Sequence, residues 1–277
     1  MNDGGEMVQA RTGLQWRFDA GYTTLARATP TEAAVGLSFD SRPHTVLMSS
    51  PADLEDLAIG FTLTEGIAGF ADILDVVVNE KPEGYLVDVR LLPGRVKQRV
   101  RPRTLEGRSS CGLCGVQRLA DAVRAIPVVS QGQRFTHEAI QRALTQLGDR
   151  QSLGRLTRAT HAAGFASAEG ELGLLREDVG RHNALDKAIG GLLKNGVDPT
   201  QGFVVVTSRC SFEMVEKTAR AGCPMIVAVS APTDLAIRKA EEAGITLVAL
   251  ARSDGHTIFS GGERLLESLP ADLAAHV

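Results

Sequence analysis

Apolar runs of strand length alternate with amphipathic helical segments between residues 203 and 251. Ser211 is suited to cap the first of the two helices in this stretch, and the second helix is predicted from about Thr233 to Ala243. The strands are predicted at Val204–Thr207, Met225–Ser230 and Thr246–Ala251. Runs that are apolar on both faces and joined by helical crossovers favour a parallel or mixed sheet covered on both sides.

Polar residues follow each of these strands, in Thr207-Ser208-Arg209, residues 230–233 and Arg252-Ser253. Ligands of open α/β sheets bind beyond the carboxyl ends of the strands, so a binding site is expected at this edge. No G-x-G-x-x-G and no Walker loop occurs, which disfavours the usual dinucleotide and nucleoside-triphosphate enzymes. Arg209 and Arg252, together with helix N-terminal amides, still suit phosphate groups.

The N-terminal half has shorter and less regular patterns. Ser50-Pro51 is predicted to start a helix, with Ser50 as N-cap, and Gly66 to end it. Strands are predicted before and after this helix, over residues 33–48, 72–79 and 84–91. Thr136 is predicted to cap a further helix that buries Ile140, Ala143, Leu144 and Leu147.

These elements predict an α/β protein in three parts. Residues 1–22 show no period and are predicted to be a poorly ordered tail. Residues 23–132 are predicted to form an N-terminal α+β domain, and residues 133–277 a C-terminal domain with the sheet. The boundary is placed near Gly132.

Composition excludes several classes of protein. The 277 residues carry 30 Lys and Arg against 33 Asp and Glu, a net charge of −3, so a broad nucleic-acid surface is not expected. No apolar run approaches the roughly 20 residues of a membrane helix, and the first residues lack the apolar centre of a secretion signal. We therefore expect a cytoplasmic protein without a membrane partner.

Two of the four cysteines form Cys111-Gly-Leu-Cys114 and lead into a predicted helix. Amides at a helix N-terminus stabilise a thiolate, and nearby arginines add to this effect. A zinc half-site, a disulfide and a chance pair are the alternatives; zinc needs two further ligands, and only His161 and His182 are close companions by type. The other two cysteines lie in apolar surroundings and are predicted to be buried and structural, namely Cys210 and Cys223.

The segment Arg176-Glu-Asp-Val-Gly-Arg-His-Asn183 gathers two arginines, two acids, a histidine and an asparagine. We interpret it as the polar head of an amphipathic helix that continues through Leu192. A solvated, salt-bridged helix start is the alternative interpretation. Gly180 indicates close backbone approach, and His182 titrates near neutrality, which favours a functional role.

Taken together, these segments resemble the formate dehydrogenase accessory sulfurtransferase family. The resemblance covers the chain from about Pro51 to Phe259. The residues that carry it are Asp53–Phe61, Thr64–Gly66, Ser109–Gly115, Thr160–Ala163, Arg176–Lys187, Ser211–Met214 and Val229–Thr233.

The resemblance implies a sulfur carrier that accepts sulfane sulfur as a persulfide from a cysteine desulfurase. It implies transfer of this sulfur to the molybdenum bis(molybdopterin guanine dinucleotide) cofactor, a bound substrate, before the cofactor enters formate dehydrogenase. It also implies a homodimer, a three-layer C-terminal domain of the cytidine-deaminase type with a mixed sheet, and no permanently bound metal. The deaminase H-x-E signature is missing here.

By the same resemblance, Cys111 carries the persulfide and Cys114 assists loading or release. The candidate residues for binding the guanine-nucleotide ends of the cofactor are Leu250, Ala251, Arg252, Ser253, Asp254, Gly255, Arg176, Arg181, His182 and Asn183. Two other classes stay open. A nucleotide-binding or zinc deaminase-like enzyme predicts stoichiometric zinc, and a pure scaffold predicts that both loop cysteines are dispensable.

Overall fold

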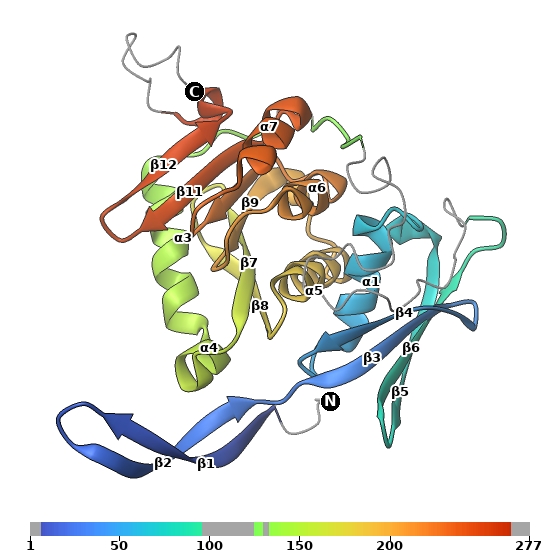
Figure 1. The fold of residues 1–277 in the computed structure, drawn as a ribbon. Coiled ribbons are helices and arrows are strands. Elements are labelled where there is room, and N and C mark those ends of the chain that lie inside the picture. The colour runs from blue at the N-terminus through green and yellow to red at the C-terminus, as the bar shows by residue number, and fades with distance from the viewer. Residues whose placement is uncertain (1–6, 96–124, 130–132, 267–277) are drawn as a thin grey trace.

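The computed structural model describes residues 7–95, 125–129 and 133–266 (Figure 1). Its strands form a two-stranded hairpin, a four-stranded sheet and a six-stranded sheet. No helix in the described ranges is long and apolar enough to cross a membrane. The predicted domain boundary at Gly132 lies outside the described residues.

The six-stranded sheet has the order β12-β11-β10-β9-β7-β8. The strands are β7 (His161–Ser167), β8 (Leu172–Asp178), β9 (Gly202–Val206), β10 (Met225–Ala228), β11 (Thr246–Arg252) and β12 (Gly255–Ser260). β9, β10 and β11 are parallel to one another, whereas β7, β8 and β12 pair antiparallel with their neighbours. The predicted mixed sheet is therefore confirmed.

Helices cover both faces of this sheet. The helices of this part are α3 (His137–Arg150), α4 (Ser152–Thr157), α5 (Arg181–Lys194), α6 (Phe212–Arg220) and α7 (Asp234–Ala243). Phe203 and Val205 of β9 pack toward α3, and Val204 and Val206 pack toward α5, α6 and α7. The sheet is therefore the middle of three layers. A strand that is covered on both faces needs apolar side chains at every position, as β9 has.

The smaller sheet has the order β4-β3-β6-β5 and packs one face against α1. Its elements are β3 (Ala33–Phe39), β4 (Arg42–Ser49), α1 (Leu54–Thr64), β5 (Ile73–Lys81) and β6 (Gly84–Leu91). Short 3₁₀ turns complete the described chain, at Phe70–Asp72, Pro199–Gln201 and Gly262–Arg264. The predicted α/β class, with a smaller α+β part beside a three-layer part, is confirmed.

The prediction of a poorly ordered tail is wrong for residues 8–17. They form β1 (Val8–Arg17), which pairs with β2 (Gly21–Pro30) in an antiparallel hairpin that extends from the body of the molecule (Figure 1). The period-2 signal is weak because alanine and threonine occupy many of its positions.

The predicted cap of α1 is also wrong. The helix starts at Leu54 after Asp53, which has a left-handed backbone (φ 53°). Ser50 instead lies at a buried carboxylate: its N–H donates to Asp178 Oδ2 at 3.0 Å, and its hydroxyl oxygen accepts from the Val179 N–H at 3.2 Å. The hydroxyl that was expected to cap the helix thus accepts from a backbone N–H 129 residues away. The predicted N-cap Thr136 is confirmed, since its hydroxyl accepts from the Ala139 N–H. Ser211 precedes α6 as predicted, but its hydroxyl donates to Glu213 Oε2 at 2.6 Å and makes no capping hydrogen bond.

Candidate functional site

The loops after β9, β10 and β11 meet at one edge of the large sheet, as predicted. The Leu250 N–H donates to the Ser230 carbonyl (3.3 Å), and the Cys210 N–H donates to the Ala231 carbonyl (3.3 Å). Because β7 is antiparallel to β9, its first residue, His161, lies at the same edge, next to Thr207. We call this edge the strand-end site.

Basic side chains gather at the strand-end site. Burial, followed by the nearby Arg181, His182 and Arg209, lowers the pKa of His161 below its ordinary value, against a smaller opposing effect of Asp178. His161 is therefore neutral at pH 7. Arg209 is exposed and Arg181 half-buried, and neither side chain donates a hydrogen bond to another described residue. Cations without partners at strand ends suit an anionic ligand.

His182 and Glu213 form the buried floor beside these cations. His182 Nε2 lies 3.7 Å from Glu213 Oε2, and Glu213 accepts from the Ser211 hydroxyl at 2.6 Å. Although burial opposes ionisation, these neighbours hold the pKa of Glu213 below its usual value. Glu213 is thus an anion beside His182 in the first turn of α5, at a distance longer than a hydrogen bond.

The predicted cofactor segment Leu250–Gly255 is the connection between β11 and β12. Arg252, Ser253 and Asp254 are exposed, and Ala251 is buried. Leu250 has a left-handed backbone (φ 51°), which is costly for a branched side chain and marks a constrained position. The segment therefore presents polar side chains at the rim of the strand-end site.

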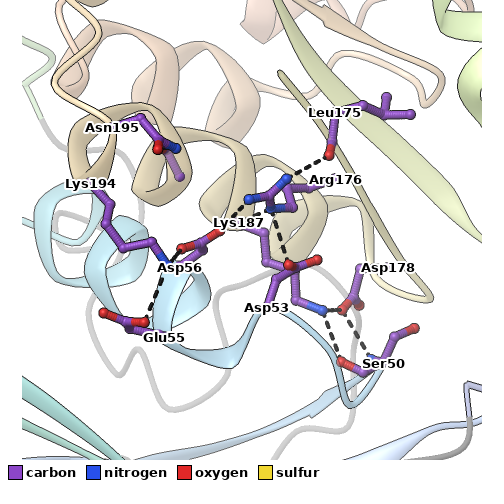
Figure 2. A network of polar contacts seen from close by, with 11 residues as sticks. Ser50, Asp53, Glu55, Asp56, Leu175, Arg176, Asp178, Lys187, Lys194 and Asn195 are labelled. Atoms are coloured by element: carbon purple, nitrogen blue, oxygen red, sulfur yellow. Dashed lines mark hydrogen bonds and ion pairs between the residues drawn. The ribbon is translucent and has the colours of Figure 1, made fainter. Parts of the chain in front are cut away.

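Arg176 and Asn183 lie elsewhere, in the contact between the two parts of the molecule, which we call the junction. Figure 2 shows Arg176 there, turned toward Asp56 of α1. Arg176 donates from Nε and Nη2 to Asp56 Oδ2 at 2.9 and 2.7 Å, and Lys194 Nζ lies 2.5 Å from Asp56 Oδ1. Asn183 Nδ2 donates to the Met48 carbonyl at 2.8 Å. Their side chains connect β8 and α5 to α1 and β4.

A fully buried ion pair lies at the centre of the junction (Figure 2). Lys187 Nζ donates to Asp178 Oδ2 at 2.6 Å and to the Ser50 carbonyl at 2.8 Å, and both charged side chains are 0% exposed. Asp178 also accepts from Ser49, Ser50, Gly180 and Asn183. Both oxygens of the Asp178 carboxylate therefore accept hydrogen bonds, as a buried charge requires.

A second buried pair, which sequence reasoning missed, joins α5, α6 and α1. Lys217 Nζ donates to Asp186 Oδ2 at 2.9 Å and to Thr64 Oγ1 at 3.0 Å. Burial opposes the charge of this lysine, but the carboxylates of Asp186 and Glu65 raise its pKa. A lysine on an amphipathic helix is normally predicted to be solvent-exposed, so the sequence gave no indication that Lys217 is buried.

Glycines allow the two helices of the junction to touch. A Cβ at Gly190 would lie 1.9 Å from the Asp56 carbonyl oxygen, and one at Gly60 would lie 1.8 Å from the Asp186 carbonyl oxygen. The backbones of α1 and α5 are therefore in direct contact, and only glycine fits at these crossing points.

The interpretation of residues 176–183 as the head of a helix is wrong, and so is the solvated alternative. The segment crosses from β8 into α5, which begins at Arg181. Asp178 is 0% exposed because the junction covers it. The residues of this segment lie in two different regions. Arg181 and His182 lie at the strand-end site. The others, Arg176, Asp178 and Asn183, belong to the junction.

The cysteines fall into two groups. Cys210 and Cys223 are buried, as predicted, and burial raises the pKa of each thiol to about 12. Cys111 and Cys114 lie outside the described residues. Among the residues that are described, no group of three or more His, Cys, Asp or Glu side chains is arranged to hold a metal ion.

Comparisons with known proteins identify the family. The family model described as the FdhD/NarQ family matches residues 30–266. The "Sulfur carrier protein FdhD" of Bordetella bronchiseptica is 45% identical over 236 residues, which cover 84% of this chain and 86% of that protein. The protein of the same name from Agrobacterium fabrum is 45% identical over 260 residues, covering 93% and 95%.

A solved structure agrees with these sequence matches. The crystal structure of a candidate formate dehydrogenase accessory protein from Desulfotalea psychrophila superposes with a TM-score of 0.75 at 25% identity. The match covers 94% of this chain and 100% of that one. Because the family model spans most of the described fold and both relatives exceed two thirds coverage, this chain belongs to the FdhD/NarQ family.

Proposed function

We propose that this chain is a sulfur carrier in the maturation of formate dehydrogenase. Its relatives are named sulfur carriers, and its structural neighbour is described as a formate dehydrogenase accessory protein. The sulfur arrives from a cysteine desulfurase and leaves to the molybdenum bis(molybdopterin guanine dinucleotide) cofactor, which is the substrate. We expect the exchange to take place in the cytoplasm.

The burial of two of the four cysteines is the observation that carries this proposal. Thiols with a pKa of about 12 and no solvent access are poor nucleophiles, which removes Cys210 and Cys223 as carriers. Cys111 and Cys114 then remain as the candidates. Cys111 is the carrier in the proposed scheme, and Cys114 the resolving thiol.

The scheme balances in atoms and electrons. In loading, the Cys111 thiolate attacks the terminal sulfur of the desulfurase persulfide; the sulfur–sulfur bond there breaks, and the desulfurase cysteine leaves as a thiolate. In release, the Cys114 thiolate attacks Cys111 Sγ, and hydrosulfide leaves for the cofactor. Oxidation of the two thiols to the Cys111–Cys114 disulfide supplies the two electrons that convert sulfane sulfur into sulfide. A cellular dithiol then reduces this disulfide.

The strand-end site is the proposed binding site for the anionic end of the cofactor. Arg181, Arg209 and Arg252 are cations without ion-pair partners among the described residues, and α5 and α6 begin there. Diphosphate groups bind at such helix starts through backbone amides and arginine side chains. Arg176 and Asn183, which are engaged in the junction, position α5 in this proposal.

Mass spectrometry tests the carrier role directly. Incubation of the chain with a cysteine desulfurase and cysteine should add the mass of one sulfur atom, and a reductant should remove it. The addition should persist in Cys114→Ala, because loading needs only the carrier thiol, and disappear in Cys111→Ala. An unchanged mass of the native chain would refute the proposal. Cys210→Ala is the matched control and should load normally.

The two alternatives give different outcomes. A zinc deaminase-like enzyme predicts stoichiometric zinc in the purified protein, which metal analysis detects. A pure scaffold predicts that a chain lacking both Cys111 and Cys114 still restores formate dehydrogenase activity in cells that lack the native protein. Our proposal predicts no restoration by that double variant.

A further inference from the structure

His161 lies among basic side chains at the strand-end site. It is the first residue of β7, it is half-buried, and its ring makes no hydrogen bond with another described residue. Burial and the neighbouring Arg181, His182 and Arg209 disfavour a positive charge on this ring, whereas Asp178 acts the other way. The imidazole is therefore neutral at pH 7 in the free protein.

The carboxylates around His161 are already engaged. Asp178 lies opposite His161 in the register of β7 and β8, but it is the buried anion of the junction. Glu177 accepts from two backbone N–H groups of α4, at 2.9 and 2.7 Å. Glu213 of α6 accepts from a hydroxyl at 2.6 Å and lies beside His182. None of these three carboxylates is therefore free to balance a positive charge on His161.

Two buried nitrogen atoms near His161 also lack a hydrogen-bond partner among the described residues. They are Arg181 Nε and His182 Nε2, and the His182 side chain is only 8% exposed. A buried polar nitrogen without a partner is unfavourable, so a ligand or water is expected to complete it. Because Arg181 and the exposed Arg209 are cations, the fitting ligand is an anion with several acceptor oxygens.

We propose that His161 is a further ligand-binding residue of the strand-end site, and that the anionic ligand binds together with one proton held on its imidazole ring. The proposal rests on the proposed function, which assigns this site to the phosphate-bearing end of the cofactor. An anion bound by Arg181 and Arg209 offsets their repulsion of a charged imidazole. It also provides an acceptor for the second N–H of the protonated ring. The proton comes from the solvent, and no covalent bond of the ligand breaks.

The coupling has a definite sign. If the bound anion favours the proton on His161, the proton favours the anion by the same factor. The affinity for the ligand should therefore rise as the pH falls from about 8 to about 6. Uptake of one proton limits this rise to about tenfold for each pH unit.

Diguanosine diphosphate is the suitable probe, because both ends of its diphosphate are esterified. The terminal phosphate of guanosine diphosphate takes up a proton of its own, with a pKa of about 6, and would obscure the effect. Calorimetry of the full chain at pH 7, in two buffers of different ionisation enthalpy, counts the protons taken up. We expect more than about half a proton for each bound ligand, and binding at least about fivefold tighter at pH 6 than at pH 8.

His161→Gln should bind the same probe without proton uptake and with little dependence on pH. His137→Gln is the matched control, since it removes a half-buried histidine of α3, on the other face of the sheet, and should take up the proton as the native chain does. Nuclear magnetic resonance of the native chain gives a readout that does not depend on the folding of a variant. The imidazole signal that is missing in His161→Gln should titrate at higher pH with the probe than without it.

Three outcomes would overturn the proposal. Binding of the probe by the native chain without proton uptake would do so and leave the proposed function intact. Uptake that persists in His161→Gln would show that another group takes the proton. A chain that does not bind the probe at any pH would remove the strand-end site as the cofactor site as well, while the mass-spectrometric test of Cys111 would still decide the carrier role.

Discussion

The junction and the strand-end site both contain charged side chains, but they treat them in opposite ways. In the junction, Lys187, Asp178 and Lys217 are buried, and each of them has a partner of opposite charge within 3.0 Å. At the strand-end site, Arg181 and Arg209 have no ion pair with any described residue. Charges in the junction fix geometry, whereas those of the strand-end site remain available to a ligand.

The difference shows how a segment rich in charged residues can mislead. Residues 176–187 contain cations, anions and amides that all look suited to catalysis or binding. Burial separates them, because a buried charge with full hydrogen bonding is structural, and a half-exposed charge without a partner is open to function. Mutations in the junction should therefore mainly lower the free energy of unfolding, whereas mutations at the strand-end site should mainly weaken ligand binding.

The largest effect is expected from Lys187→Met. Removal of this ammonium group leaves the Asp178 carboxylate buried without its counter-charge, which should lower the free energy of unfolding by about 3–5 kcal/mol. Urea denaturation followed by circular dichroism measures it. Lys194→Met is the control on the same helix: its side chain is 39% exposed, so the loss should be about 1 kcal/mol or less. Equal losses in both variants would show that burial does not separate Lys187 from Lys194.

Gly190→Ala should come next. The added Cβ would lie 1.9 Å from the Asp56 carbonyl oxygen, so α1 and α5 must separate, at a cost of about 1–3 kcal/mol. Gly148→Ala in α3 has open space around its Cβ and should stabilise the protein by about 0.5–1 kcal/mol. Thermal unfolding of the two variants should thus move in opposite directions; a higher melting temperature for Gly190→Ala would rule out the close crossing.

Arg209→Ala should separate binding from stability. Loss of one charge-assisted hydrogen bond, about 1.5–3 kcal/mol, should weaken the binding of guanosine diphosphate at least tenfold in calorimetry. The free energy of unfolding should change by less than about 0.5 kcal/mol, because the side chain is exposed. Arg238→Ala, an exposed arginine on α7, should bind as the native chain does. Unaltered binding in Arg209→Ala would remove this arginine from the site.

The smallest effect concerns pH. Burial and the neighbouring cations lower the pKa of His161, so the unfolded chain takes up its proton first as the pH falls below about 6.5. The free energy of unfolding should therefore fall through this window, toward the lowered pKa of the folded state. His161→Gln should make that fall shallower in urea titrations between about pH 5 and 7. An identical slope in the variant would show that His161 has no part in it.

Sequence reasoning located elements whose signals are local. The alternating strands and helices of residues 203–251 and the cap Thr136 were predicted because each depends on residues a few positions apart. Cys210 and Cys223 were predicted as buried for the same reason, since both lie among apolar neighbours.

The rest depends on contacts between distant residues. Ser50 binds a carboxylate 128 positions away, and Lys217 binds Thr64 across 153 positions. No periodicity encodes such pairs, so the cap of α1 and the buried lysine of α6 were missed. The strand-end site was predicted in outline, because parallel strands bring their ends together. The sequence did not show which charged residues belong to this site and which to the junction, because that depends on their burial in the fold.

Helix α5 belongs to both regions at once. Its first turn carries Arg181 and His182 beside the sheet edge, and two turns later Lys187 and Gly190 are wedged against α1. The buried ion pair of Lys187 and the backbone contact at Gly190 hold α5 firmly against α1. The position of Arg181 therefore depends on how α1 of the small sheet packs against α5.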